Sequence, residues 1–449
     1  MRILIIGDGG REHVLTHLAS QSEAVDEIYC PGKNAGILSE PKCERLDLPE
    51  PGHAGIIAAA KQKKIDLIIV GPEKYLAEGI IDNCRTAGLS IFGPTKKAAH
   101  IESSKNFAKQ LMRAAEVPTA HAANFRRNQI EEAKLYLEMW NKYPVVIKAD
   151  GLAAGKGVKI CQTEEGAMAA INSCFIDDEF GAAGEQILIE EFLVGHPLLK
   201  RAELSVMALV DIHGDFAMML PAQDYKPVYN DDQGPNTGGM GSYAPIPWVT
   251  QAMMDEIDKK IFKPIIDRMK ALGMPFSGAL YAGLIWTAQG PKVIEFNCRF
   301  GDPEIQPLSM LLETDLIKVM KHIADGGSIA SPFMLQWRRG ATVCVVMANH
   351  GYPNTYKKDA EIFGLQDFGQ DVCVFHAGTK FNGENHIFTN GGRVLGVTAY
   401  SPAAATPNDS LRIAAHKAYQ AMREITWTDA DDHGPYYRTD IAEDVPYKI

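Results

Sequence analysis

The sequence lacks three features, and each absence excludes a class of protein. It holds no apolar run near the about 20 residues of a membrane-spanning helix, and its first residues, MRILIIGDGG, reach glycine after one short strand-like run. Positive charge is in deficit: the formal net charge of −11 opposes non-specific attraction to nucleic acid and anionic lipid. The eight cysteines form no Cys-x-x-Cys pair and no cluster with histidine, which argues against zinc and indicates reduced thiols. We expect a cytoplasmic protein without a signal peptide that binds neither nucleic acid nor membrane.

The sequence does contain enough apolar material for several cores. Hydrophobic residues make up 46% and charged residues 22% of 449 residues, which is typical of a globular protein of about three domains. The first hundred residues alternate short apolar strands, at 3–6, 27–29, 67–70 and 89–92, with helical stretches at 12–20, 54–63 and 76–86. This alternation predicts an open parallel α/β sheet, and ligands collect at the carboxyl ends of such strands.

Two further regions follow this sheet. A helix is predicted from 103 to about 118, and strands at 144–148, 187–193 and 292–297 follow it among glycine-rich and loop-rich stretches. Beyond residue 327 we expect strands at 342–348, 372–377 and 393–399 and a helix at 409–425. The predicted domains are therefore 1–102, 103–327 and 328–449, the last of them rich in strands.

A glycine loop gives the most specific local motif, VVIKADGLAAGKGV at 145–158. Small residues let backbone N–H groups approach a triphosphate closely, and Lys148 and Lys156 would neutralise its charge. Gly155 and Gly157 belong to the same predicted ATP site. The spacing is not that of a Walker A motif, so a P-loop NTPase is not supported. Taken alone, the segment also fits a plain β-hairpin turn.

Two acidic patterns follow the loop. In ILIEEFL at 187–193, a carboxylate such as Glu190 would accept from the adenine amine, and the backbone of Glu191 to Leu193 would pair with the base edge; solvated edge glutamates are the alternative. In KVIEFNCRFGDPE at 292–304, Glu295, Asn297 and Arg299 share one face of a strand. The first two are hard oxygen ligands suited to Mg²⁺, and the arginine suits a carboxylate or phosphate. The alternative interpretation of this second pattern is a solvated strand face without a ligand.

Taken in order, these motifs and Lys105 resemble the ATP-grasp family. The resemblance implies that ATP and Mg²⁺ or Mn²⁺ lie between two α+β subdomains, with a mobile lid at about 120–193, and that a carboxylate is activated as an acyl phosphate. Lys105 matches the family's first phosphate-contacting lysine, and Glu203 its ribose ligand. The implied nucleotide-binding residues are Lys105, Lys148, Gly155, Lys156, Gly157, Glu190, Glu191, Phe192, Leu193 and Glu203, and the implied catalytic residues are Arg299, Lys148 and Lys105.

Within that family, the whole chain is similar to the glycinamide ribonucleotide synthetases. The resemblance lies in IGDGGREH at 6–13, VGPE at 70–73, GPNTGGMGSYAP at 234–245, EFNCRFGDPEIQ at 295–306, FHAGTK at 375–380 and TNGGRVL at 389–395. It implies a monomer that ligates glycine to 5-phosphoribosylamine through glycyl phosphate, in the second step of de novo purine biosynthesis. The implied substrate-binding residues are Gly9, Gly10, Arg11, Glu12, Asn34, Glu73, Asp224, Lys226, Asn236, Thr237, Gly238 and Asp302.

Three segments depart from the family pattern. QDYKP at 223–227 replaces Gln-Asp-His-Lys-Arg, so Asp224 and Lys226 carry over while the flanking His and Arg contacts do not. The segment 195–205 is longer than expected before Glu203, and PGKNAG carries the extra Lys33. Three alternatives stay open: another ATP-grasp ligase or carboxylase, a dinucleotide-binding dehydrogenase, and a non-catalytic nucleotide sensor. The dehydrogenase would want an acid where the second strand ends in Tyr29-Cys30-Pro31.

Overall fold

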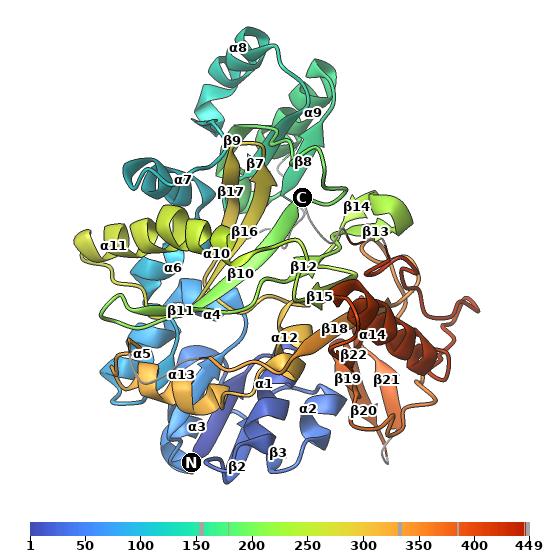
Figure 1. Cartoon of the computed structure of the whole chain (residues 1–449). Helices are drawn as coiled ribbons and strands as arrows, with labels where there is room; N and C mark the ends of the chain where they lie inside the picture. The colour runs from blue at the N-terminus through green and yellow to red at the C-terminus, as the bar shows by residue number, and fades with distance from the viewer. Residues whose placement is uncertain (152–156, 178, 331–334, 384–385, 444, 446–449) are drawn as a thin grey trace.

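Four principal sheets and the helices around them make up the protein, seen in a computed structural model (Figure 1). The structure describes residues 1–151, 157–177, 179–330, 335–383, 386–443 and 445. Gly155 and Lys156, both expected at the nucleotide, lie outside these ranges. Over the described part of the chain, no helix is long and apolar enough to cross a membrane.

The N-terminal sheet is parallel throughout, with the strand order β3-β2-β1-β4-β5. The predicted open parallel α/β sheet is therefore confirmed. Its strands are β1 (Arg2–Ile6), β2 (Glu27–Cys30), β3 (Cys43–Arg45), β4 (Leu67–Val70) and β5 (Ile91–Phe92), and the helices of this part are α1 (Gly10–Gln21), α2 (Ala35–Ser39), α3 (Gly52–Lys63), α4 (Glu73–Glu78), α5 (Ile80–Thr86), α6 (Lys96–Ser103) and α7 (Lys105–Ala114).

The predicted helices differ from the observed ones by a few residues at their ends, and two of these differences have a visible cause. The expected helix at 76–86 is divided at Gly79, whose φ of 94° is left-handed and ends α4 before α5 begins. The helix expected from residue 103 begins at Lys105, because the Ser104 side chain accepts a hydrogen bond from the Phe107 N–H and caps it. A preceding helix, α6, was not predicted.

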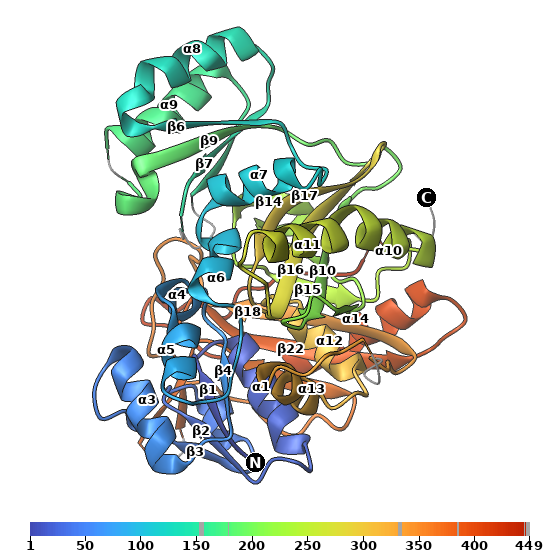
Figure 2. The same cartoon turned by 90° about the vertical axis from the view of Figure 1, so that its left-hand side faces the viewer.

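Two antiparallel sheets build the middle of the molecule. Both have four strands. The sheet with the shorter strands has the order β6-β9-β7-β8 and carries helices α8 and α9. We call this unit, residues 120–193, the lid, and Figure 2 shows it standing apart from the rest. The larger sheet has the order β11-β10-β16-β17. The elements are β6 (Ala122–Arg126), α8 (Ile130–Trp140), β7 (Val145–Ala149), β8 (Val158–Cys161), α9 (Glu164–Phe175) and β9 (Gln186–Glu191) in the lid, and β10 (Glu203–Val210), β11 (Phe216–Met218), α10 (Gln251–Ile257), α11 (Lys263–Ala271), β16 (Gly278–Thr287) and β17 (Gly290–Asn297) in the larger unit.

The C-terminal sheet draws strands from two parts of the chain. Its order is β12-β15-β18-β22-β19, so two short strands from the middle of the sequence pair with the C-terminal ones. The elements are β12 (Gln223–Asp224), β15 (Gly241–Ala244), α12 (Ile305–Leu311), α13 (Leu316–Ala324), β18 (Gly340–Ala348), β19 (Val372–His376), β22 (Arg393–Pro402) and α14 (Pro407–Met422), with the separate pairs β13 (Pro227–Tyr229) with β14 (Gln233–Asn236) and β20 (Thr379–Asn382) with β21 (His386–Thr389).

The apolar cores follow a different division from the sheets. Two large buried clusters each combine residues of the N-terminal sheet, the larger middle sheet and the C-terminal sheet. The lid instead has a cluster of its own, which includes Leu137, Ile147 and Ile189. The lid is thus a separately packed unit, whereas the remaining three sheets share their cores.

Candidate active site

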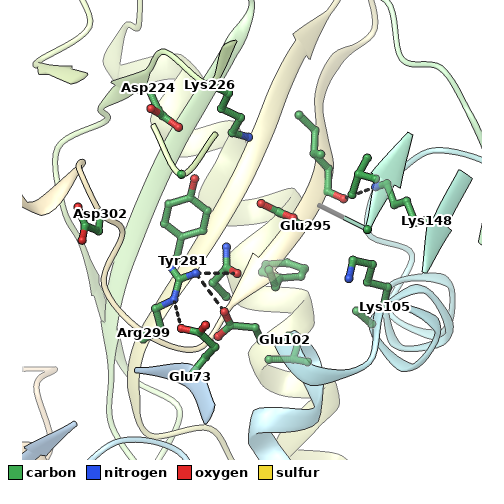
Figure 3. Close-up of a pocket in the computed structure, with 18 of the residues that line it drawn as sticks. Glu73, Glu102, Lys105, Lys148, Asp224, Lys226, Tyr281, Glu295, Arg299 and Asp302 are labelled. Atoms are coloured by element: carbon green, nitrogen blue, oxygen red, sulfur yellow. Dashed lines mark hydrogen bonds and ion pairs between the residues drawn. The ribbon is translucent and has the colours of Figure 1, made fainter. Parts of the chain in front are cut away.

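A cavity of about 420 Å³ lies where the lid, the larger middle sheet and the N- and C-terminal parts meet (Figure 3). Among the described residues, fourteen charged side chains of both signs line it. The carboxylates are Glu73, Glu102, Glu190, Asp224, Glu295, Asp302 and Glu304, and the lysines and arginines are Arg11, Lys105, Lys109, Lys148, Lys226, Arg299 and Arg393.

Strand β17 places Glu295 and Asn297 on the cavity wall, and Arg299, two residues beyond the end of the strand, also lines the cavity. The alternation is not complete, however. The register of β17 against β16 shifts beside Glu295, and both Ile294 and Phe296, which strict alternation would put on the opposite face, also border the cavity. A bulge of this kind adds one residue to a strand and redirects the side chains beside it.

The Glu295 carboxylate is poised for a cation. Burial favours its neutral form, but Lys226, Lys148 and Lys105 outweigh this and lower the pKa of Glu295 below its usual value. No side chain or backbone group of the described residues donates a hydrogen bond to this carboxylate, and none of those residues forms a cluster of three or more acidic, His or Cys ligands. Two oxygen donors, Glu295 and Asn297, fit a cation such as Mg²⁺ that completes its shell with phosphate oxygens and water.

Arg299 is held between two carboxylates. Its Nη2 lies 3.2 Å from Glu102 Oε1, and its Nε lies 3.6 Å from Glu73 Oε2. Burial opposes the charge, yet Glu102 and Glu73 together raise the pKa of Arg299 above its usual value. Glu73 Oε2 is also 3.7 Å from Arg11 Nη2. One carboxylate oxygen therefore lies close to both Arg11, in the first domain, and Arg299.

Of the three predicted phosphate lysines, the two that are described, Lys105 and Lys148, enter the cavity from different units. Lys105, at the start of α7, donates from Nζ to Gly151 O at 2.7 Å, and burial lowers its pKa. Lys148, on β7 of the lid, lies 2.9 Å from Glu190 Oε2 and donates to Ile294 O on β17 at 3.3 Å. Strand β7 of the lid, which bears Lys148, and strand β17, which bears Glu295 and which we call the acidic strand, therefore face each other across one cavity.

The predicted adenine residues divide into two groups. Glu190 is buried, so the alternative of a solvated edge glutamate does not apply to it, and its Oε1 has no hydrogen-bond partner within the described residues. Glu191 instead exchanges bonds with His121 at the edge of the lid. Glu203 is half-exposed, 3.4 Å from Lys226 Nζ. Among the predicted nucleotide-binding residues that the structure describes, those that do not line the cavity are Glu191, Phe192, Leu193 and Glu203.

The predicted substrate residues also divide. The cavity is lined by Arg11, Glu73, Asp224, Lys226, Thr237, Gly238 and Asp302, but not by Gly9, Gly10, Glu12, Asn34 or Asn236. Two N–H groups at the start of α1 are already bound by protein carboxylates: Gly9 N–H donates to Glu12 Oε2 at 2.6 Å, and Arg11 N–H donates to Asp302 Oδ2 at 3.3 Å.

Asn34 lies behind the cavity as a bridge between domains. Its Nδ2 donates to the carbonyl oxygens of His376 and Ala377, both at 2.9 Å, and its Oδ1 accepts from the Gly36 and Ile37 N–H groups. The PGKNAG turn is thus fastened to the C-terminal sheet at a residue that is fully buried.

A buried acid and a lysine mark the cavity wall around β12. Burial and the nearby Glu304 raise the pKa of Asp224, whose Oδ1 has no hydrogen-bond partner in the described part of the chain. Burial opposes the charge of Lys226, but Glu203 and Tyr281 raise its pKa above the usual value. Figure 3 shows these two side chains and Glu295 directed into the same space.

Several lining residues were missed from the sequence, among them Glu102, Lys109, Tyr281, Glu304, Tyr352 and Arg393. Lys109 follows Lys105 by four residues on a helix, a spacing that places both on one face and was available as a signal. Arg393 comes from the C-terminal sheet; it donates to Asp302 O at 2.8 Å and to Gly239 O at 3.3 Å. Nothing local in the sequence places it there.

Models of three consecutive domains match the chain. They describe the N domain of phosphoribosylglycinamide synthetase over residues 1–102, its ATP-grasp (A) domain over 103–305 and its C domain over 342–444. A phosphoribosylamine–glycine ligase of Caldanaerobacter subterraneus is 44% identical over 98% of this chain and 99% of that protein. The chain belongs to the phosphoribosylglycinamide synthetase family. The resemblance read from the sequence motifs is confirmed.

Other relatives and solved structures agree with this family and with the predicted fold. A phosphoribosylamine–glycine ligase of Rhodopirellula baltica is 43% identical over 98% of this chain and 97% of its own length. The crystal structure of phosphoribosylamine–glycine ligase from Thermotoga maritima superposes with a TM-score of 0.79 at 28% identity, covering 98% of this chain and 100% of that one. A biotin carboxylase from Campylobacter jejuni, in complex with β-γ-ATP, gives a TM-score of 0.73 at 18% identity over 98% and 94% of the two chains, which supports the ATP-grasp fold alone.

Proposed function

We propose that this protein is an ATP-dependent ligase that joins the carboxylate of glycine to the amine of 5-phosphoribosylamine and yields glycinamide ribonucleotide, ADP and phosphate, a step of purine biosynthesis. The observation that carries the proposal is the single cavity between Lys148 of the lid and the Glu295–Asn297 strand. It offers opposite walls for a triphosphate and reaches Arg11 and Asp302 on the acceptor side.

On the nucleotide side, five residues take the roles expected from their chemistry. Glu190, with its buried and unpartnered Oε1, accepts a hydrogen bond from the adenine amine. Lys105 and Lys148 stabilise the negative charge of the transferring phosphoryl group. Glu295 and Asn297 hold Mg²⁺ or Mn²⁺, which when bound neutralises phosphate charge.

On the acceptor side, Arg299 orients the glycine carboxylate toward the γ-phosphate. Glu73 and Glu102 keep that guanidinium in one place, so less conformational freedom is lost when glycine binds. Asp224 and Lys226 line the same cavity as Arg299 (Figure 3), and Arg11 lines it too. Arg11 and Arg393 provide positive charge for the ribose phosphate.

Two bond exchanges complete the reaction. A glycine carboxylate oxygen bonds to the γ-phosphorus as the bond to the bridging oxygen of ADP breaks, giving glycyl phosphate. The neutral amine of phosphoribosylamine then bonds to the acyl carbon, phosphate leaves with the bonding electrons, and the nitrogen loses one proton. Glycyl phosphate is labile to water, and closure of the lid over the cavity would exclude water from it.

The test is ADP release measured with glycine alone, with phosphoribosylamine alone and with both. ADP release that requires both substrates supports the ligase. ADP release that depends on neither substrate excludes it. Glycine labelled with ¹⁸O in its carboxylate adds a second readout: the acyl phosphate route transfers one labelled oxygen to inorganic phosphate. If the ligase is active but the phosphate carries no label, the glycyl phosphate intermediate is ruled out while the ligase activity stands.

The alternatives have less support. A carboxylase shares the ATP-grasp fold at 18% identity, but the domain models of this family match the two ends of the chain as well as its middle. A dinucleotide-binding dehydrogenase needs an acidic residue at the end of β2, where Cys30 stands. A non-catalytic nucleotide sensor would bind ATP and fail the ADP-release test.

A further inference from the structure

The lid joins the remainder of the protein through two adjacent segments, 119–122 on the way in and 190–193 on the way out. β6 and β9 pair at Ala122 and Glu190, and Glu191 N–H donates to His121 O at 2.9 Å. The entering segment is also fixed to the acidic strand, because Thr119 Oγ1 donates to Val293 O at 2.7 Å. Any change in the angle of the lid must pass through this pair of segments, which we call the hinge.

A buried lysine binds both halves of the hinge at once. Lys109 lies on α7, outside the lid, and is only 4% exposed. Its Nζ donates to Thr119 Oγ1 at 2.7 Å and to Ala120 O at 3.3 Å, and lies 3.3 Å from Glu190 Oε2. An ammonium group has three donors, and here each has an acceptor.

The position of Lys109 also decides which oxygen of Glu190 is free. Lys109 and Lys148 both approach Oε2, at 3.3 and 2.9 Å, while Oε1 has no hydrogen-bond partner in the described part of the chain. Two cations on one oxygen fix the rotation of the carboxylate. Without Lys109, Lys148 alone would hold Glu190, and that lysine is the one assigned to the triphosphate.

We propose that Lys109 is a positioning residue: it fixes the hinge and turns Glu190 so that Oε1 is presented to the exocyclic amine of the adenine base. The inference rests on the proposed function only in taking ATP as the nucleotide. Burial lowers the pKa of Lys109 to about 8, against the attraction of Glu190, so the group is charged at neutral pH. Its effect is exerted through Glu190 and the hinge rather than by contact with the reacting phosphate.

The experiment compares the binding of ATP and of inosine triphosphate, each with Mg²⁺ and without glycine, to the full-length protein by calorimetry. Inosine triphosphate carries a carbonyl oxygen where adenine carries the amine, so it reports the orientation of Glu190. Lys109→Met should raise the Kd for ATP about tenfold, the scale of one lost charge-assisted hydrogen bond, and change the Kd for inosine triphosphate much less. The preference for ATP should therefore shrink.

Two controls keep the result interpretable. Lys97→Met removes an exposed lysine on α6 and should change neither Kd. If Lys109→Met fails to fold, Thr119→Val removes the hydroxyl that Lys109 binds while preserving shape, and Thr119→Ser keeps it. The valine variant should lose part of the ATP preference and the serine variant should retain it.

A folded Lys109→Met protein with unchanged ATP preference would overturn the proposal. So would equal losses for both nucleotides, since that result would make Lys109 a general stabiliser of the fold. Wild-type protein that binds neither nucleotide would contradict the proposed function itself. Nucleotide binding with no ligase product would leave the role of Lys109 standing and remove only the assigned reaction.

Discussion

The lid and the acceptor side of the cavity are built in opposite ways. The lid packs around its own core and touches the rest through the hinge and a few polar contacts such as Lys148 with Ile294. The acceptor side is joined across domains by buried apolar clusters and by bonds such as Asn34 to His376 and Arg393 to Asp302. One wall of the active site is therefore pre-assembled, whereas the other is suited to movement.

The largest effect on activity should come from a mutation that removes the charge interaction between the two walls. Glu295→Ala removes the carboxylate that faces Lys148 of the lid and Lys105 of α7, and we expect ligation to fall about 10²–10³-fold, as when a preorganised charge-stabilising group is lost. Glu138→Ala on the exposed surface of the lid is the matched control. Steady-state kinetics at saturating Mg²⁺ measures the effect; retained activity would remove Glu295 from the site.

A core mutation in the lid should weaken that wall alone. Leu137 is fully buried in the lid cluster, and Leu137→Ala should destabilise it by about 2–5 kcal/mol. Hydrogen exchange should then accelerate in β7 and β9 and stay unchanged in β18 and β22. Leu395→Ala, in the shared core, should do the reverse. Uniform acceleration in both regions would show that the lid is not an independent unit.

A mutation on the acceptor side should spare nucleotide binding. Arg393 holds Asp302 and the loop at Gly239, and its replacement by Met should lower kcat/KM for phosphoribosylamine about 10–100-fold, the range for lost hydrogen bonds to a charged group. The Kd for ATP, measured without the acceptor, should not change. A parallel loss of ATP binding would mean that the two walls are coupled in the free protein.

The last effect, modest over a single pH unit, concerns the acid stability of the acceptor side. His376 is buried beside His13, and burial lowers the pKa of His376 to about 3 and lowers that of His13. Both folded pKa values lie below the unfolded value of about 6.5, so below pH 6.5 the unfolded chain binds the extra protons. The free energy of unfolding should fall as pH falls from 6.5 toward 3, by up to about 1.4 kcal/mol per pH unit for each histidine.

Urea unfolding at pH 7.5 and 5.5 checks this slope. His376→Gln should make stability less dependent on pH over that interval, whatever its effect on stability at pH 7.5. His196→Gln, outside this interface, should keep the wild-type slope. An unchanged slope in His376→Gln would mean that this imidazole is protonated in the folded protein.

The sequence predicted what depends on near neighbours in the chain. Alternation placed Glu295, Asn297 and Arg299 on one wall, and the parallel order of the first strands followed from their spacing. Contacts across long separations were out of reach: Arg393 meets Asp302 across 91 residues, and β15 pairs with β18 far along the chain. The bulge at Ile294 was equally hidden, because it depends on the partner strand.

Gly9 and Gly10, which the family resemblance implies for substrate binding, show the same limit. A strand–glycine–helix turn offers free N–H groups to an anion, and that much is local. Glu12, three residues along, and Asp302, in another domain, already accept from Gly9 and Arg11. A role for these glycines in holding the ribose phosphate remains a prediction, which requires those carboxylates to move or the phosphate to lie nearer the Arg11 side chain.

The equal numbers of acidic and basic side chains around the cavity bear on how substrates arrive. With seven of each among the described residues that line it and a net charge of −11 over the whole chain, the protein provides no long-range attraction for anionic nucleotides and sugar phosphates. Diffusional encounter must then proceed against mild repulsion, which dissolved salt screens. Capture should consequently hold steady or quicken as ionic strength rises, unlike that of enzymes whose positive fields draw their substrates in.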